Sequence, residues 1–213
     1  MKPTTLNTSI VVIADGYDPF ELYACSLPGQ GIVPPEWKLV EQPISTPVLS
    51  VLKFANGTVI TLEPNKLMVM REMPDPATSI SGIVTALLER STRSQLSAVG
   101  LNMSAFVDEK NPGQWITERF LKQGSQNQES LKPTALGVKL VYRSETGAVH
   151  LNCEAAIRKA EGVDTSGVLL NFNHHTPISG PDTVAQAKAA IASFGKQLAN
   201  FNEIGESILR QEI

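Results

Sequence analysis

The chain has 213 residues, with 18 basic and 21 acidic side chains and a formal net charge of −3 at pH 7. Its hydrophobic content of 42% excludes wholesale disorder, because such a chain can bury enough apolar surface to form a core. The slight acidic excess disfavours a protein held to nucleic acid mainly by phosphate neutralisation, which needs a basic surface.

Two cysteines, Cys25 and Cys153, lie far apart, and this spacing predicts neither a disulfide framework nor a thiol zinc site. The first apolar stretch, residues 10–14, is shorter than the roughly 7–15 residues of a secretion-signal core. No apolar run approaches the roughly 18 residues of a membrane span. We therefore expect a cytoplasmic protein that does not enter a membrane.

The first element is a run of mostly β-branched residues at 9–14, bounded by Asn7 and by Asp15-Gly16, which predicts a buried strand. Residues 17–47 contain six prolines, which remove backbone donors and prevent regular structure. The segment also carries aromatic residues that solvated linkers usually lack. We expect an ordered, proline-rich arm across the surface, with one short strand at 37–41.

Strands are predicted next at 48–55, 58–63 and 66–72. Asn56-Gly57 between the first two predicts a hairpin with a type I′ turn, in which both central residues have positive φ. Helical spacing of apolar residues predicts an amphipathic helix over 77–90. A further strand is predicted at 95–107.

Asn111-Pro112 predicts the start of a helix that ends near Gly124. A polar loop at 125–130 precedes predicted strands at 136–143, 149–157 and 168–173, the first two forming a hairpin. A long final helix is expected to begin at Asp182 or Thr183 and to reach almost to Ile213, with Gln186 completing a capping box if Thr183 is the cap.

Strands that occur in hairpins, rather than alternating with helices, predict an α+β fold with a mostly antiparallel sheet. Two βββα-like units are visible, at about 48–90 and 135–211. No composition break divides the chain, so we expect a single domain over residues 1–213. The alternative is two intimately packed halves, 1–107 and 108–213.

The candidate catalytic residues are acidic and histidine side chains at strand ends and along one strand: Asp15, Asp18, His150, Glu154, His174 and His175. His150 and Glu154 share one face of an extended strand, whereas adjacent histidines point to opposite faces. Either His174 or His175 lies close to His150 and Glu154 only if the strands pair in a suitable register. Because this set is incomplete, we predict no metal and no cofactor.

Phosphate-loop and dinucleotide-binding motifs are absent from the sequence, as are a nucleophile elbow and the H-E-x-x-H metalloprotease motif. These absences favour a non-enzymatic protein. In the final helix, apolar residues repeat at alternating intervals of three and four, which is typical of a coiled-coil seam or of a face packed on a sheet. About 30 residues at 1.5 Å each would span about 45 Å, long enough to reach a partner.

We therefore predict a binding or assembly protein that contacts a protein partner or a second copy through the arm and the final helix. The candidate contact residues are apolar side chains of these two segments: Phe20, Tyr23, Trp37, Leu198, Phe201 and Ile208. One alternative is a metal-dependent or hydrolytic enzyme at the residues above. A second is a subunit of a nucleic-acid-processing complex, since Arg90, Arg119 and Arg158 lie in mild basic clusters, although nucleic acid is not expected as the sole ligand.

Overall fold

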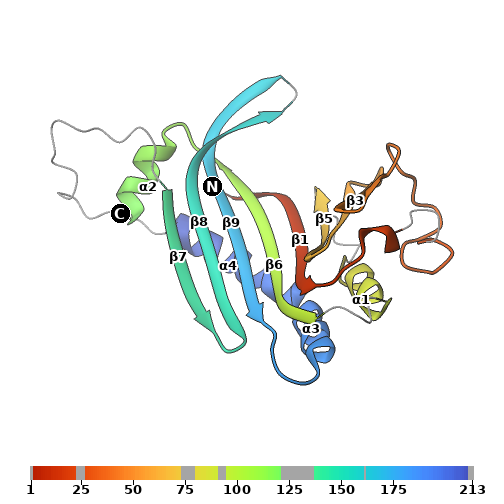
Figure 1. Cartoon of the computed structure of the whole chain (residues 1–213). Helices are drawn as coiled ribbons and strands as arrows, with labels where there is room; N and C mark the ends of the chain where they lie inside the picture. Colours follow the sequence, from red (N-terminus) through yellow and green to blue (C-terminus); the bar gives the residue numbers. More distant parts are fainter. Residues whose placement is uncertain are drawn as a thin grey trace.

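The structure is a computed structural model that describes residues 2–22, 27–72, 80–90, 95–120, 137–160 and 162–210. Within these ranges the chain forms one nine-stranded sheet in which every neighbouring pair is antiparallel. The order across the sheet is β2-β3-β4-β5-β1-β6-β9-β8-β7 (Figure 1). The predicted α+β class with a mostly antiparallel sheet is confirmed.

The elements have the following bounds in chain order: β1 Thr4–Asp15, the 3-10 helix η1 Pro19–Glu21, β2 Ile44–Thr46, β3 Leu49–Lys53, β4 Thr58–Glu63, β5 Lys66–Glu72, α1 Ile80–Arg90, β6 Gln95–Asp108, α2 Pro112–Phe120, β7 Gly137–Ser144, β8 Gly147–Ala160, β9 Val163–Pro177, α3 Thr183–Ala192 and α4 Phe194–Arg210. The two βββα-like units correspond to β3-β4-β5-α1 and to β7-β8-β9 followed by α3 and α4. The long strands β1 and β6 lie between them in the sheet.

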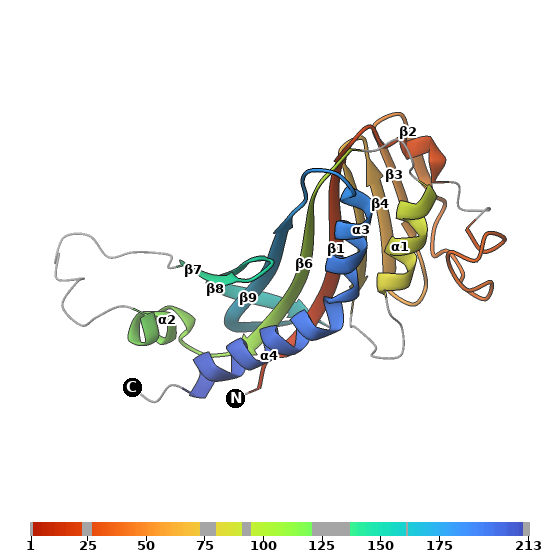
Figure 2. The same cartoon turned by 90° about the horizontal axis from the view of Figure 1, so that it is seen from below.

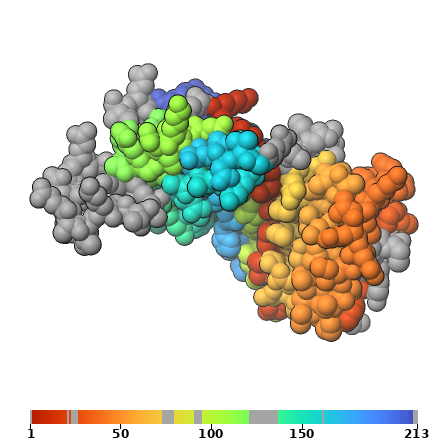
Figure 3. All heavy atoms as spheres, turned by 90° about the horizontal axis from the view of Figure 1, so that it is seen from above, coloured from red at the N-terminus to blue at the C-terminus, as the bar shows by residue number. Residues whose placement is uncertain are grey.

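All four α-helices pack on the same face of the sheet (Figure 2). Because side chains alternate along a strand, this face receives every second residue, such as Ile10 and Val12 of β1 and Val99 and Leu101 of β6. No described helix covers the other face, which we call the open face. In the view of Figure 3 the molecule is elongated, with β3 and β4 towards one end and α2 towards the other.

The core consists of two clusters. The first core cluster joins α1 and α3 to β1, β4, β5 and the beginning of β6, and includes Ile60, Val84 and Ile191. The second joins α2 and α4 to β7–β9 and the end of β6, and includes Leu151 and Phe201. Leu198, near the start of α4, packs against both clusters.

The expected single C-terminal helix is divided at Ser193. The Ser193 N–H donates to the carbonyl oxygens of Ala189 and Ala190, at 3.3 and 3.1 Å, and its hydroxyl also donates to Ala190. These tight bonds end α3 and let α4 take a new direction along the second core cluster (Figure 2). The apolar stripe predicted from the sequence therefore follows two helices and packs on the protein's own sheet.

Two predictions at turns have different outcomes, and the type I′ turn is wrong in detail. The hairpin at Asn56-Gly57 forms, but only Gly57 has positive φ, at 78°. The Gly57 N–H donates to Phe54, and Phe54 donates to Thr58, which is the pattern of a three-residue loop ending in a left-handed glycine. The final helical segment begins after Asp182, one of the two predicted caps, so the capping box that depended on Thr183 as the cap does not arise. The Gln186 amide donates to the carbonyl oxygens of Ser179 and Pro181.

The proline-rich arm is ordered where it is described. Leu27, Ile32 and Val33 are buried in the first core cluster, and the Trp37 ring meets Phe54 edge-on, with centroids 5.2 Å apart. In place of the strand predicted at 37–41, the arm forms a single bridge between Leu39 and Phe54. Two backbone hydrogen bonds flank this bridge, from the Val40 N–H to Lys53 and from the Ala55 N–H to Lys38.

Candidate functional site

The structure does not bring the predicted catalytic residues together. Asp15 ends β1, and Asp18 caps η1 by accepting a hydrogen bond from the Phe20 N–H at 2.9 Å. Both carboxylates belong to exposed residues at turns. His150 and Glu154 lie on β8, in another part of the sheet.

The strand register separates the histidines. On the open face, His150 is opposite Asn173, whereas His175 is opposite Ala148 and Glu154 is opposite Leu169. On the open face the cross-strand neighbours of His150 are Asn173 and Val141, neither of which is ionisable. Asn173 donates to Asn102, which in turn donates to Ser9 at 3.2 Å. In the described part of the chain, no three His, Cys, Asp or Glu side chains form a group that could hold a metal ion.

His174 lies on the opposite face, towards the helices, and is only 1% exposed. Its Nε2 is 3.0 Å from the Ser144 hydroxyl, and its Nδ1 is 3.4 Å from the Thr176 hydroxyl. Burial, and to a smaller extent the charge of His175, lowers the pKa of His174, which favours the neutral imidazole. A neutral ring with one donor and one acceptor is satisfied by two hydroxyls. Among the described contacts the second ring nitrogen meets no carboxylate of the kind that orients histidine in hydrolytic triads.

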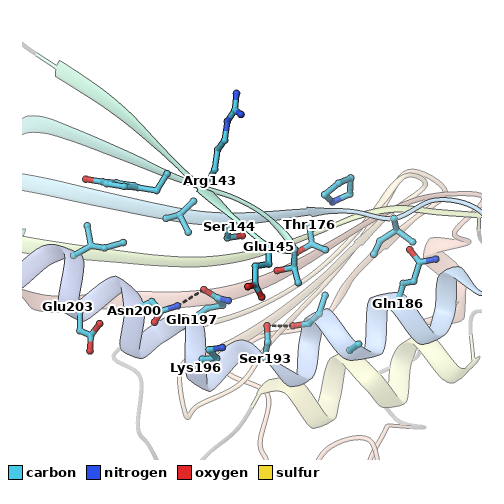
Figure 4. A pocket seen from close by; sticks show the side chains of 18 residues that line it. Arg143, Ser144, Glu145, Thr176, Gln186, Ser193, Lys196, Gln197, Asn200 and Glu203 are labelled. Carbon is cyan, nitrogen blue, oxygen red and sulfur yellow. Dashed lines mark hydrogen bonds between the residues drawn. The ribbon is translucent and has the colours of Figure 1, made fainter.

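A groove of about 860 Å³ lies between the helices and the end of the β7–β8 hairpin (Figure 4). One wall is formed by the hairpin turn and its flanking residues, including Tyr142, Ser144 and Glu145. The end of β9 contributes Thr176, and α3 and α4 form the other wall. His174 is therefore connected to the groove through two hydroxyls that line it.

Charged side chains of both signs line this groove. Lys196 and Glu203 lie along α4, seven residues apart, and Glu145 extends from the hairpin turn towards the helices in Figure 4. Arg143 also borders the groove, but its side chain points away from it. No ion pair involving these four side chains occurs among the described residues, so the charges of Glu145, Lys196 and Glu203 are available to a ligand in the groove.

The backbone is tightly packed where the groove meets the hairpin. A Cβ atom on Gly147 would lie 2.0 Å from the His175 carbonyl oxygen, so only glycine allows β8 to start this close to β9. This contact positions the turn, and with it Ser144 and Glu145, above the end of β9.

The residues predicted for partner contact fall into different environments. Phe20 is 40% exposed on η1, and Tyr23 lies outside the described residues. Leu198 is half-buried between the two core clusters. Phe201 and Ile208 are buried in the second core cluster, where the Phe201 ring stacks on Phe172 at a centroid distance of 5.2 Å. Their side chains are thus occupied by the protein's own sheet.

Sequence analysis missed the polar residues of the groove. Lys196, Asn200 and Glu203 follow helical spacing on the side of α4 that is free of the core, but such a pattern is also that of any solvated helix face. These residues line a groove only because the hairpin turn around Glu145 lies opposite them. That turn is about 50 residues earlier in the chain.

In comparisons with known proteins, no family model matches the chain, and no curated protein is significantly similar to it in sequence. Among the helices that the structure describes, none has the length and apolar character needed to cross a membrane.

Proposed function

We propose that this protein is a non-enzymatic binding protein that holds a segment of a protein partner in the groove between α3–α4 and the β7–β8 hairpin. The observation that carries the proposal is the groove itself, with a volume of about 860 Å³ and with Glu145, Lys196 and Glu203 free of ion pairs in the described chain. Uncommitted charges in a concave site supply specificity to a polar ligand.

The dimensions favour a polypeptide over a small molecule. The wall formed by α3 and α4 runs from Gln186 to Glu203, and the path along the two helices is about 25 Å at 1.5 Å per residue. An extended chain rises about 3.3 Å per residue, so about seven or eight residues fit along this wall. Apolar side chains also line the groove: Ile204 is half-buried, whereas Val149 and Ile178 are buried at its base.

Nucleic acid fits the surface less well, because arginines from the basic clusters are engaged within the protein. Arg90 donates to Gln30, and the Arg119 guanidinium lies over the Trp115 ring at 4.1 Å and donates to the Ile208 carbonyl. Arg158 lies over Phe106 and contacts Asp108. We also propose a cytoplasmic location, because the widely separated Cys25 and Cys153 are typical of a reducing compartment.

Site-specific photo-cross-linking in the cells that make the protein tests the proposal. A benzoylphenylalanine at Asn200, which lines the groove, is expected to cross-link to one polypeptide. The same probe at Asn202, which is exposed on α4 but does not line the groove, is the matched control and is expected to give no such product.

The charge reversal Lys196→Glu is expected to reduce the product at residue 200 at least severalfold, with an unchanged circular dichroism spectrum, because Lys196 is exposed and unpaired in the described structure. Equal products at residues 200 and 202, or no product at residue 200, would contradict groove binding.

A further inference from the structure

The two edges of the sheet differ. β2, at one edge, has only three residues, whereas β7, at the other, has eight, Gly137–Ser144. β7 pairs with β8 on one side, and no described strand pairs with its other side. Such an edge presents a row of free backbone N–H and C=O groups, and proteins normally shorten, bulge or cover such an edge or place charged side chains on it.

The side chains of β7 differ between its two faces. Val138 and Leu140 pack towards the helices against the second core cluster, and Tyr142 continues this row into the groove. On the open face, Lys139 and Arg143 are exposed on either side of Val141, which is 53% exposed. Neither cation has an ion pair in the described part of the chain.

We infer that the segment of the partner is an extended strand that adds to the free edge of β7, with carboxylates on its open face and apolar side chains towards the helices. The inference rests on the proposed groove-binding function and specifies the chemistry of the partner. Backbone pairing with β7 would supply affinity, and the alternate side chains would supply specificity. Carboxylates opposite Lys139 and Arg143 form favourable cross-strand pairs.

Charge also argues against a second copy of β7 as the occupant. In symmetric antiparallel pairing centred on Val141, Lys139 of one copy would be opposite Arg143 of the other, and like charges in that position are destabilising. If the pair is instead centred on Leu140, Lys139 lies opposite Val141. The Lys139 and Arg143 side chains of both copies, four cations in all, still lie on one face. An acidic strand removes this repulsion, and so the occupant is a different, acidic segment.

The test uses two synthetic capped octapeptides, one of alternating Glu and Val and one of alternating Lys and Val, with binding to the full chain followed by fluorescence anisotropy. Exposed ion pairs contribute about 0.2–1 kcal/mol each. The Glu peptide makes two attractive pairs with Lys139 and Arg143 where the Lys peptide makes two repulsive ones, and we therefore expect the Glu peptide to bind roughly tenfold more tightly. The double variant Lys139→Glu/Arg143→Glu is expected to reverse this preference.

The control variant Lys38→Glu/Arg210→Glu makes the same change in net charge away from β7, at two exposed residues, and is expected to keep the preference. Equal binding of the two peptides, no binding of the Glu peptide, or the same reversal in the control would overturn the inference.

The two proposals fail separately. If cross-linking at residue 200 continues unchanged in Lys139→Glu/Arg143→Glu, strand addition at β7 is overturned and groove binding stands. If residue 200 gives no product in the unsubstituted background, groove binding itself is overturned.

Discussion

At the scale of single residues, His174 shows how a buried polar group is accommodated beside the groove. Its two ring nitrogens face the hydroxyls of Ser144, at the end of β7, and of Thr176, near the end of β9. A cationic imidazole would donate from both nitrogens, and burial would remove its charge from water, which disfavours the cation. The neutral ring is therefore part of what holds the β7–β8 turn against β9.

We expect this burial to make folding depend on pH. Because the folded pKa of His174 is lowered, the folded protein binds fewer protons than the unfolded chain, whose histidine pKa is about 6.5. The stabilisation is complete above that value, and the free energy of unfolding should fall as the pH is lowered through about 6.5. Urea unfolding at pH 7.5 and 5.5 should show the loss in the unsubstituted protein and a smaller loss in His174→Gln.

His150→Gln is the matched control, since it removes a histidine from the open face and leaves His174 in place. A pH dependence that is the same in His174→Gln as in the unsubstituted protein would show that other groups cause it.

At the scale of elements, α4 has two faces with separate tasks. One face packs Phe201 and Ile208 into the second core cluster, and the other presents Lys196 and Glu203 to the groove. The bend at Ser193 makes both possible, because α3 follows the first core cluster while α4 crosses to the second. A straight helix of the length predicted from the sequence would have left one of the clusters with a single covering helix, α1 or α2.

Truncating the buried face of α4 should therefore be costly. Phe201→Ala removes a fully buried ring that stacks on Phe172, and buried Phe→Ala changes typically reduce the free energy of unfolding by about 3–5 kcal/mol. The neighbouring Asn202→Ala, at an exposed position, should stay within about 0.5 kcal/mol. Urea denaturation followed by far-UV circular dichroism measures both. Similar stabilities of the two variants would indicate that this part of α4 does not pack on the sheet.

At the scale of the whole molecule, the sheet links the two core clusters into one structure. β6 contributes Val99 and Leu101 to the first and Met103 and Val107 to the second. α3, from the C-terminal half of the chain, contributes Ile191 to the cluster built mainly by the N-terminal half. Neither half therefore has a complete core of its own, and we expect one cooperative unit.

The two tryptophans allow this to be measured. Trp37 contacts the first core cluster, and Trp115 belongs to the second. In each of the variants Trp37→Phe and Trp115→Phe, the urea midpoint from the remaining tryptophan's fluorescence should coincide with that from far-UV circular dichroism, as two-state unfolding requires. Midpoints that differ in either variant would show that residues 1–107 and 108–213 unfold separately.

Local patterns in the chain were enough to predict most of the architecture. Period-two alternation located the strands, helical spacing located Ile80–Arg90, and Asn111-Pro112 located the start of α2, because these features depend on residues close in sequence. Such patterns also place His150 and Glu154 on one face of a strand. They do not say which strands become neighbours or in which register.

The proposed binding surfaces depend on those long-range choices. The groove combines side chains near Glu145, Thr176 and Lys196, and the proposed strand-binding edge belongs to β7 because β7 is the last of the described strands in the sheet order. His174 faces the helices while His150 faces the open side, because β8 and β9 pair in one particular register. Contacts between distant segments form only when apolar faces are buried together, so the tertiary structure was needed to find the site.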